Sequence, residues 1–491
     1  MFLSLNYMWG SNSTFQLDSE TLVSGVIYAD YNAVSLNEYG LGRYYDTLGV
    51  LEDYDRSFIT DEIWDNGYSR RENKICISNN KYTKEVAIKG NYIQFSNGAV
   101  FKILNMESID EYLILSLETE ESLTYNKYGD LLSVCFLNAQ LIPFEKGLLI
   151  PYQSQYGIQG KIFCKLSHYM NPDQSVSCLN LFCCLLAAIV FVLVVIILFY
   201  KYDFLMATCF FITFLLSPWC INFARNLYWV EFTWFIPMLT GVFCAWKINN
   251  KACRIMSYII AFLSVMLKCL CGYEYISTIM LGLITFLLVD FFLAIVNKDT
   301  RASRILFRTT FIMSIIAMLA FLTAILIHAN LRGNGDVISG IKDIYIQDVL
   351  RRTVGGNIED WPEAYWASFN ASVGETLKKY FQFSTDIITG ISGRLFLALC
   401  IVPICIFIYN YTRYRLMDWE LSFMYIVFLL TSISWFILAK AHSYIHTHMN
   451  YVLWYFGFIQ ICFYIICKQI MRILHKHKII RRKNLTSSHY H

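Results

Sequence analysis

Long apolar runs separated by short polar connectors dominate the chain after Cys178. A run of about 20 apolar residues is long enough to cross a bilayer as a helix. The run at 232–246 is short, so we expect it to be tilted or partly re-entrant. The pattern predicts a mainly α-helical, polytopic transmembrane bundle of about nine or ten spans, with apolar runs at about 178–200, 204–222, 232–246, 254–271, 276–297, 305–328, 394–411, 418–439 and 450–471.

A set of basic residues occurs in every second connector between these runs. If the crossings alternate, all of these residues lie on one side of the membrane, and the side rich in Lys and Arg is the cytoplasm. The opposite side then carries the N-terminal domain, the loop of about 329–393 and the short connectors at 223–231, 272–275 and 440–450. The basic positions are Lys201, Lys247, Lys251, Arg254, Lys298, Arg301, Arg304, Arg413, Arg415 and those of the tail from Arg472 to Lys483.

The residues before the apolar runs follow a different period. Apolar and polar residues alternate from Val86 to Ile103 and again from Tyr112 to Leu117, which is typical of half-buried strands. The pair Asn97-Gly98 between alternating stretches is the strongest short signal for a hairpin. We therefore expect a β-rich insertion within an extracytoplasmic domain at residues 11–177.

The remaining boundaries follow from changes of pattern. Residues 1–10 are apolar but too short for a span or a signal peptide, and a domain on the far side needs an anchor. We expect them to be the outer end of a first transmembrane helix whose beginning is missing. Residues 178–328 and 394–471 are expected to hold transmembrane helices, 329–393 an extracytoplasmic loop, and 472–491 a basic cytoplasmic tail that meets anionic lipid.

The composition agrees with a membrane protein. The chain has 491 residues, of which 56% are hydrophobic and 16% are charged, whereas a soluble domain has roughly a quarter charged. The net charge is only +3 and the basic residues lie in short connectors, so nucleic acid is not an expected partner. Most of the 16 cysteines lie in apolar runs, where they pack as small hydrophobes. The connectivity, if any, of Cys76, Cys135, Cys164 and Cys178 stays open.

Two carboxylates, Asp18 and Glu20, come just after the expected first helix. An ionised carboxylate at the membrane surface can take the proton of an attacking sugar hydroxyl, so both are candidate catalytic residues. Acidic residues in this position also cap the start of a helix and interact with its dipole. The spacing leaves both interpretations open.

An acidic pair after a first helix, followed by a surface helix and many spans, resembles the GT-C superfamily of membrane glycosyltransferases. That superfamily includes protein mannosyltransferases, aminoarabinose transferases and the phage-type Gtr glucosyltransferases that convert the serotype of bacterial O-antigen. Three short segments also resemble motifs of bacterial membrane proteins of this kind: Tyr152-Gln153-Ser154-Gln155-Tyr156-Gly157-Ile158-Gln159-Gly160-Lys161, Ala224-Arg225-Asn226-Leu227-Tyr228-Trp229 and His442-Ser443-Tyr444-Ile445-His446-Thr447-His448-Met449-Asn450.

The resemblance implies an inverting glycosyltransferase of the bacterial inner membrane with an extracytoplasmic active site. Its donor would be a polyprenyl-phosphate-linked sugar such as glucose, and its acceptor a cell-surface glycan such as O-antigen, as in lipopolysaccharide biosynthesis and serotype conversion. The first-loop acid is the catalytic base in such enzymes, which points to Asp18 first and Glu20 second. In the first segment, Tyr152, Gln155 and Gln159 would contact substrate. The long insertion after Asp30 departs from a compact first loop and leaves the acceptor contacts open.

Arginines mark two places where the donor phosphate could bind. Arg225, followed by Asn226, lies near the interface, where a guanidinium can hold a lipid phosphate through two hydrogen bonds. Arg351 and Arg352 precede Gly-Gly and could hold a diphosphate or sugar phosphate, while Trp361 could stack on a sugar ring. Interfacial anchoring of the first arginine, and a helix lying on the membrane in the second segment, are the alternatives.

Histidines and one glutamate complete the candidate set. His442 and His446 have the i, i+4 spacing of one helical face and, with His448, are candidates for contact with the phosphate. A metal site is the alternative; it is not favoured because no carboxylate lies nearby, and no cofactor is expected. Glu274 lies between two spans, where an ionisable group is a candidate for substrate binding, although a solvated turn would also place it there.

Two further function classes fit part of the pattern. A polymerase or ligase of O-antigen or another polysaccharide would rely on loop arginines more than on a first-loop acid. A transporter would show ionisable residues near mid-span or broken helices in matching halves. Lys268 and Asp290 do lie inside apolar runs, but the sequence shows no convincing internal repeat, so transport is the least favoured class.

Overall fold

The computed structural model describes residues 17–46, 64–65, 67–110, 112–129, 131, 134–353, 363, 366–382, 386–415, 417–447 and 449–487. They form two compact units. The β unit consists of Leu17–Gln153 and Gly157–Val176, and the helical unit consists of Ser154–Tyr156 and the residues from Ser177 onward. The first helix expected at residues 1–10 lies outside the described residues.

An antiparallel sheet forms most of the β unit, as the alternating pattern predicts. Its core is the hairpin of β6 and β7, on which Leu113 and Leu115 of β7 are fully buried. The turn at Asn97-Gly98 joins β5 to β6, and Gly98 has a φ of 87°, so the predicted hairpin is confirmed. Among the described residues, the sheet has seven strands in the order β2 (Trp64–Asp65), β3 (Tyr68–Ser69), β4 (Lys74–Ser78), β7 (Tyr112–Leu117), β6 (Val100–Ile109), β5 (Tyr92–Gln94) and β8 (Cys135–Leu137).

The rest of the β unit combines helices with a second strand pair. Helix α2 (Leu17–Tyr31) packs on strand β1 (Gly42–Tyr45) and on helix α5 (Ile158–Ser167). Strand β1 pairs with β9 (Leu148–Pro151), so the two ends of the sheet insertion are held together. Gly25 allows the close packing of α2, because a Cβ there would lie 2.5 Å from the Gly42 carbonyl oxygen. Two short helices, α3 (Lys81–Val86) and α4 (Tyr125–Tyr128), accompany the large sheet.

The helical unit contains the apolar runs, and the protein is a multi-pass membrane protein. Among the described residues, seven helices are long and apolar enough to cross a bilayer, and a bent pair, α7 (Phe204–Leu215) and α8 (Pro218–Arg225), makes up to eight. Helix α9 (Phe232–Trp246), expected to be short, has 15 residues. The seven are α6 (Pro172–Lys201), α10 (Lys251–Cys271), α11 (Ile276–Val296), α12 (Thr300–Arg332), α17 (Gly393–Tyr414), α18 (Trp419–Leu438) and α20 (Phe458–Ser487).

The bend between α7 and α8 has a local cause. The two helices meet at 65°. Pro218 occupies the first turn of α8, where it cannot continue the hydrogen bonds of α7, and the Ser217 side chain accepts a hydrogen bond from the Cys220 backbone N–H. The apolar run at 204–222 is therefore two helices instead of one straight span.

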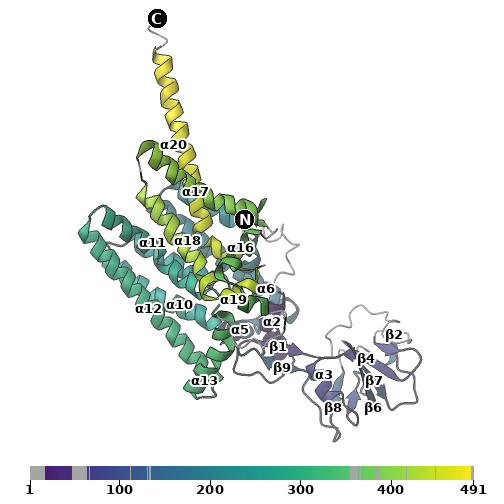
Figure 1. The fold of residues 1–491 in the computed structure, drawn as a ribbon. Coiled ribbons are helices and arrows are strands. Elements are labelled where there is room, and N and C mark those ends of the chain that lie inside the picture. The colour runs from purple at the N-terminus through teal and green to yellow at the C-terminus, as the bar shows by residue number, and fades with distance from the viewer. Residues whose placement is uncertain are drawn as a thin grey trace. The chain divides into compact units, whose positions relative to one another are not determined.

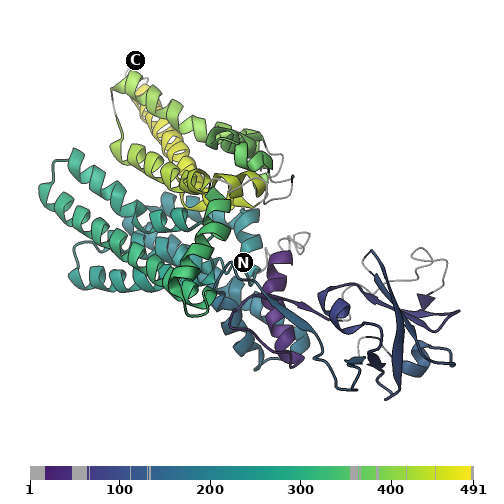
Figure 2. The ribbon, with the colours of Figure 1, turned by 60° about the horizontal axis from the view of Figure 1, so that its bottom comes forward.

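Helices α10, α11 and α12 pack against one another and run side by side in Figures 1 and 2. The bundle has two ends, which we name after residues at each. The Glu274 end holds the connector between α10 and α11, and the Asp418 end holds the connector between α17 and α18. Lys201 forms an ion pair with Asp290 in the last turns of α11, which places the end of α6 at the Asp418 end.

The segment expected as a long loop at 329–393 contains several short elements. The connector after α18 contains helix α19 (Lys440–Ile445) and the 3₁₀ helix η6 (Asn450–Tyr455). The expected tail at 472–491 continues α20 as helix as far as Ser487. The described elements between α12 and α17 are α13 (Val337–Ile344), the π-helical η3 (Tyr345–Leu350), α14 (Arg351–Thr353), α15 (Trp366–Asn370), α16 (Val373–Gln382), β10 (Asp386–Ile388) and β11 (Ile391–Ser392).

Candidate functional site

The tight connector between α10 and α11 positions a buried carboxylate. Gly272 ends α10, and Tyr275 has a left-handed backbone with a φ of 64°, so the chain reverses within four residues. A side chain at Gly272 would meet Glu274 Oε2 at 2.6 Å and Gln155 Oε1 at 2.8 Å. The glycine therefore leaves the space in which Glu274, only 4% exposed, lies against a second polar side chain.

Polar side chains from distant segments converge on Glu274. Gln155 Nε2 donates hydrogen bonds to Glu274 Oε1 at 2.6 Å and to the Tyr228 hydroxyl at 2.5 Å. The guanidinium of Arg352, in α14, lies 3.3 Å from Glu274 Oε1. Glu274 and Gln155 were predicted as substrate-binding residues and Arg352 as a phosphate ligand, and the structure brings all three together.

Lys268 supplies a second cation to this group. It is 2% exposed, and its Nζ donates a hydrogen bond to the Gly272 carbonyl at 2.6 Å. The charges of Glu274 and Arg352 both act on it. We call Gln155, Tyr228, Lys268, Glu274 and Arg352 the Glu274 cluster. Arg352 and Lys268 both offer N–H donors at this place, which suits an anionic ligand.

Polar residues near the cluster form pairs of their own. Arg332 is paired with Asp343 and with Asp348, the latter at 2.8 Å, so its charge is matched by neighbours. The Tyr273 hydroxyl lies 3.2 Å from His328 Nδ1, and the two rings stack. Burial raises the pKa of Tyr273 well above its ordinary value, so the phenol stays neutral and acts only through hydrogen bonding.

His442 lies in helix α19 and His446 directly follows it, and this helix packs against a helix of the cluster. Helix α19 packs against α14, which carries Arg352. His442 and His446 project from the same face of this segment, with ring centroids 4.5 Å apart. The predicted i, i+4 pairing is therefore present beside the helix of the arginine. His448 lies outside the described residues, as does Trp361, and the side chain of Arg351 in α14 is not described.

A hollow of about 300 Å³ lies beside α19, next to helices α15 and α16. It is lined by residues of α15, α16 and α19, among them Glu375, Lys378, Lys379 and Tyr444. Lys379 lies over the Tyr444 ring, 3.6 Å from its centroid, and donates a hydrogen bond to the Tyr444 carbonyl. The hollow thus combines ammonium groups with an aromatic face.

A second buried carboxyl group was not predicted from the sequence. Glu231 precedes α9 and is fully buried. Among the described residues, neither of its oxygens has a nitrogen or oxygen hydrogen-bond partner, and the Cys220 thiol lies beside it. Burial raises the pKa of the Glu231 carboxyl well above its ordinary value, which favours the protonated form. Nearby, Trp229 stacks on Tyr275 and Trp234 meets the same ring edge to face.

Arg225 and Asn226, which were predicted to bind the donor phosphate, take part in hydrogen bonds within the protein. The Asn226 side chain accepts hydrogen bonds from the backbone N–H groups of Tyr228 and Trp229, at 2.9 and 3.2 Å, and so fixes the turn before α9. The carbonyl of Arg225 accepts a hydrogen bond from Asn180. Their predicted contact with a phosphate stays a prediction.

The predicted catalytic acids belong to the β unit. Glu20 lies in α2 and is 7% exposed, while Asp18 lies in the same helix with an undescribed side chain. Tyr152 and Gln159 also belong to the β unit, and Gln159 is 3% exposed. Their assignment to catalysis and substrate binding therefore rests on the sequence resemblance.

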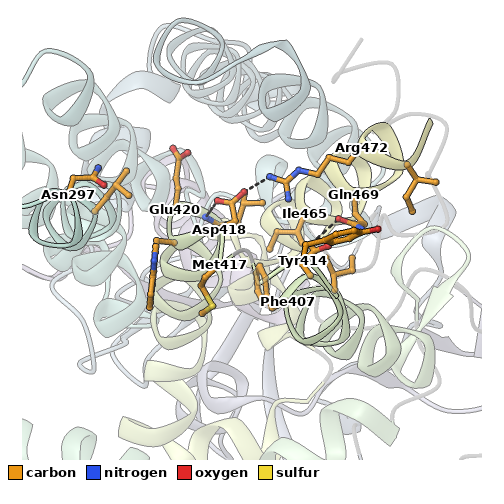
Figure 3. A pocket seen from close by; sticks show the side chains of 15 residues that line it. Asn297, Phe407, Tyr414, Met417, Asp418, Glu420, Ile465, Gln469 and Arg472 are labelled. Carbon is orange, nitrogen blue, oxygen red and sulfur yellow. Dashed lines mark hydrogen bonds and ion pairs between the residues drawn. The ribbon is translucent and has the colours of Figure 1, made fainter. Parts of the chain in front are cut away.

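A cavity of about 680 Å³ lies at the Asp418 end, between the connector of α17 and α18 and helices α11 and α20 (Figure 3). Among its lining residues, Arg472 pairs with Asp418 at 2.5 Å, Asn410 donates a hydrogen bond to Gln469, and Glu420 adds a further carboxyl group. Since Glu274 precedes α11 and Asn297 follows it, the cavity and the Glu274 cluster are separated by this 21-residue helix, roughly 30 Å.

Sequence reasoning missed two members of the cluster, for different reasons. Lys268 carries a readable signal, since a cation inside an apolar run is costly without a partner. Tyr228 lies in the second of the segments that resemble family motifs, but it was not selected, because a tyrosine near an interface is ordinary.

Comparisons of the chain with known protein families, with curated proteins and with solved structures find no match.

Proposed function

We propose that this protein is a membrane glycosyltransferase of the GT-C type, which transfers a sugar from a polyprenyl-phosphate-linked donor to a cell-surface glycan such as O-antigen. The Glu274 cluster is the observation that carries this proposal. It gathers three residues at one end of the bundle that the sequence indicated separately: Gln155 by the resemblance, Arg352 as a loop arginine and Glu274 as an ionisable group between two spans.

The position of the cluster fits a lipid-linked phosphate. Such a donor keeps its phosphate at the membrane interface while its prenyl chain stays among the lipids. Lys268 is in the last turn of α10 and Glu274 immediately precedes α11, so both lie where helices leave the apolar layer. Arg352 can bind two phosphate oxygens at once, and Lys268 provides a second positive charge. Histidines of α19 add neutral or charged donors beside them.

The reaction is an inverting displacement. The acceptor hydroxyl oxygen attacks the anomeric carbon from the side opposite the phosphate, and the bond between that carbon and the phosphate oxygen breaks. In the family that the sequence resembles, an ionised first-loop acid, which points to Asp18 or Glu20 here, takes the hydroxyl proton, and polyprenyl phosphate leaves with the bonding electron pair. Buried cations stabilise the charge that develops on the departing phosphate.

The proposal places the enzyme in a bacterial inner membrane with the Glu274 end facing away from the cytoplasm. Lys201 and the connectors rich in Lys and Arg lie at the Asp418 end, which the positive-inside rule assigns to the cytoplasm. The acceptor glycan would then be reached from the extracytoplasmic side.

Transfer from defined donors tests the proposal. The full-length protein in lipid vesicles is incubated with a panel of labelled polyprenyl-phosphate sugars and a surface-glycan acceptor. Arg352→Ala should lower donor use by at least about tenfold, because a buried phosphate ligand is lost. Arg394→Ala, which removes an exposed arginine that begins α17, should leave transfer unchanged. No transfer from any donor by the wild type, or equal effects of both substitutions, would refute the proposal.

The acids separate this enzyme class from a polymerase or ligase. Asp18→Asn keeps the side-chain shape but cannot accept the proton, and loss of a general base costs about a hundredfold to ten-thousandfold in rate. Glu20→Gln is the matched comparison, and only one of the two should be indispensable. One observation favours the polymerase or ligase class. Within the helical unit, α14, which carries Arg352, packs against the histidine-bearing helix α19. Full activity in both acid variants with loss in Arg352→Ala would select that class instead.

A further inference from the structure

A group of three metal-ligating side chains lies within the β unit, outside the Glu274 cluster. Asp30, Cys164 and His168 place one ligand atom each within 4.8 Å of one another. The imidazole Nε2 of His168 is hydrogen-bonded to Asp30 Oδ2, and the Cys164 thiol lies beside the same carboxylate. None of the three has a part in the proposed glycosyl transfer.

The helices explain why these side chains meet. Cys164 belongs to α5 and His168 follows that helix directly, with helical backbone angles, so the i, i+4 spacing puts both on one face. Asp30 comes from the last turn of α2, which packs against α5. The Tyr31 hydroxyl donates a hydrogen bond to the Ser167 carbonyl at 2.7 Å, which ties the two helix ends together next to the three side chains.

Their chemistry matches one class of ion. Thiolate, imidazole and carboxylate are the ligands of zinc, whereas calcium and magnesium take oxygen ligands. Zinc bonds of roughly 2.0–2.3 Å in a tetrahedron separate ligand atoms by roughly 3.3–3.6 Å. The three ligand atoms lie within 4.8 Å of one another, so their separations are of the size that one zinc ion requires. A simple ion pair explains Asp30 with His168, but it does not account for a thiol one helical turn before the histidine.

We propose that Asp30, Cys164 and His168 bind one zinc ion, with water in the fourth position. Cys164 is buried, while His168 is exposed, so the ion would enter from the solvent side and lie against helices α2 and α5. The bound ion would fix the end of α2 to α5. The inference does not depend on the function proposed above, because it concerns ion binding and not sugar transfer.

Direct measurement of bound zinc tests the site. The full-length protein, purified in detergent with a tag free of histidine, is stripped with a chelator, re-equilibrated with zinc and analysed for metal content. Wild type should hold one zinc per chain. His168→Gln, at an exposed position that leaves the core intact, should weaken zinc binding by more than about a hundredfold, since even loss of an outer hydrogen-bond partner costs up to that much. Asp30→Asn should act in the same direction.

Matched controls identify the ligands. Cys135→Ser changes another cysteine of the β unit, and His446→Gln changes the histidine pair of α19; both should keep one zinc per chain. Cobalt reports the thiolate separately, because cobalt bound to sulfur gives a near-ultraviolet charge-transfer band, which Cys164→Ser should abolish. Wild-type protein that holds no zinc overturns the proposal, and so does zinc binding that survives His168→Gln or is lost in His446→Gln.

Discussion

At the scale of residues, the charged groups of the helical unit differ in how they are compensated. Glu274 accepts a hydrogen bond from Gln155 and pairs with Arg352, so its charge is matched by a hydrogen bond and an ion pair. Removing one partner of such a buried set leaves an uncompensated charge, which is costly. Glu231 is compensated differently, because burial keeps its proton on.

Glu231 predicts a dependence of stability on pH. Its pKa is raised in the folded protein, while in the unfolded chain it is near 4.5. As the pH rises above that value, the unfolded state loses the proton and the folded state keeps it, so the free energy of unfolding falls by about 1.4 kcal/mol per pH unit until the folded pKa is reached. Glu231→Gln removes this loss, so its melting temperature in detergent should gain on the wild type as the pH rises from 5 towards neutrality.

An exposed glutamate of the same unit is the control. The backbone N–H and hydroxyl of Ser372 donate hydrogen bonds to Glu375, which lowers the pKa of that carboxyl. Its contribution is complete above its unfolded pKa and is lost only as the pH falls through the lowered value, so Glu375→Gln should differ from wild type by a constant amount between pH 5 and 8. A flat difference for Glu231→Gln as well would show that this carboxyl is ionised in the folded protein.

At the scale of elements, close backbone approaches determine how the helices pack. Helix α9 contacts α11 along its length, and α11 in turn contacts α18. A Cβ at Gly241 of α9 would overlap the carbonyl oxygen of Leu283 in α11. Because Gly241 has no side chain, the short α9 can pack closely against the full-length span α11. This close contact compensates for the small number of turns in α9.

Gly241→Ala should therefore destabilise the helical unit by about 1–3 kcal/mol, because backbone must move to admit the methyl group. Gly374→Ala in α16 is the matched control, since its Cβ would have a nearest neighbour 3.9 Å away. Alanine favours a helix over glycine by about 0.5–1 kcal/mol, so the control should be neutral or stabilising. Thermal unfolding in detergent measures both. Equal effects would mean that the contact between α9 and α11 is not limiting.

At the scale of the whole molecule, the two ends of the helical unit carry different groups. The Glu274 end holds the buried cluster and the short helices α14 and α19, while the Asp418 end holds Lys201 and the cavity of Figure 3. In a bilayer this asymmetry requires a fixed orientation.

Epitopes at exposed turns test that orientation. A tag inserted at Gly335, between α12 and α13, or at Gly98, in the β hairpin, should be accessible from outside intact spheroplasts, whose outer membrane has been removed, because both lie in segments predicted to be extracytoplasmic. A Cβ at either glycine would have no neighbour within 4 Å, so insertion should not disturb packing. A tag at Lys298, between α11 and α12, should be accessible only after permeabilisation. The reverse result would place the Glu274 cluster in the cytoplasm and remove the basis for an extracytoplasmic glycan acceptor.

The sequence by itself determined the elements whose signal is local. Membrane helices need about 20 apolar residues and strands alternate every second residue, so α10, α11 and the hairpin of β5 and β6 could be recognised from short windows. The segment after α12 was predicted as a loop, because its helices are too short to be stable without tertiary contacts. Helix α13 packs against α12, and α14, α15 and α16 pack against α19.

Tertiary structure decided which polar residues meet. Gln155 and Glu274 are 119 residues apart, and no local rule links them; the tight turn after α10 and the close approach allowed by Gly272 do. The same holds for Asp30, which reaches Cys164 and His168 only because α2 packs on α5. Sequence periodicity determines which face of an element is apolar, but the partner of a buried charge depends on how separate elements pack, and that information is spread over the whole chain.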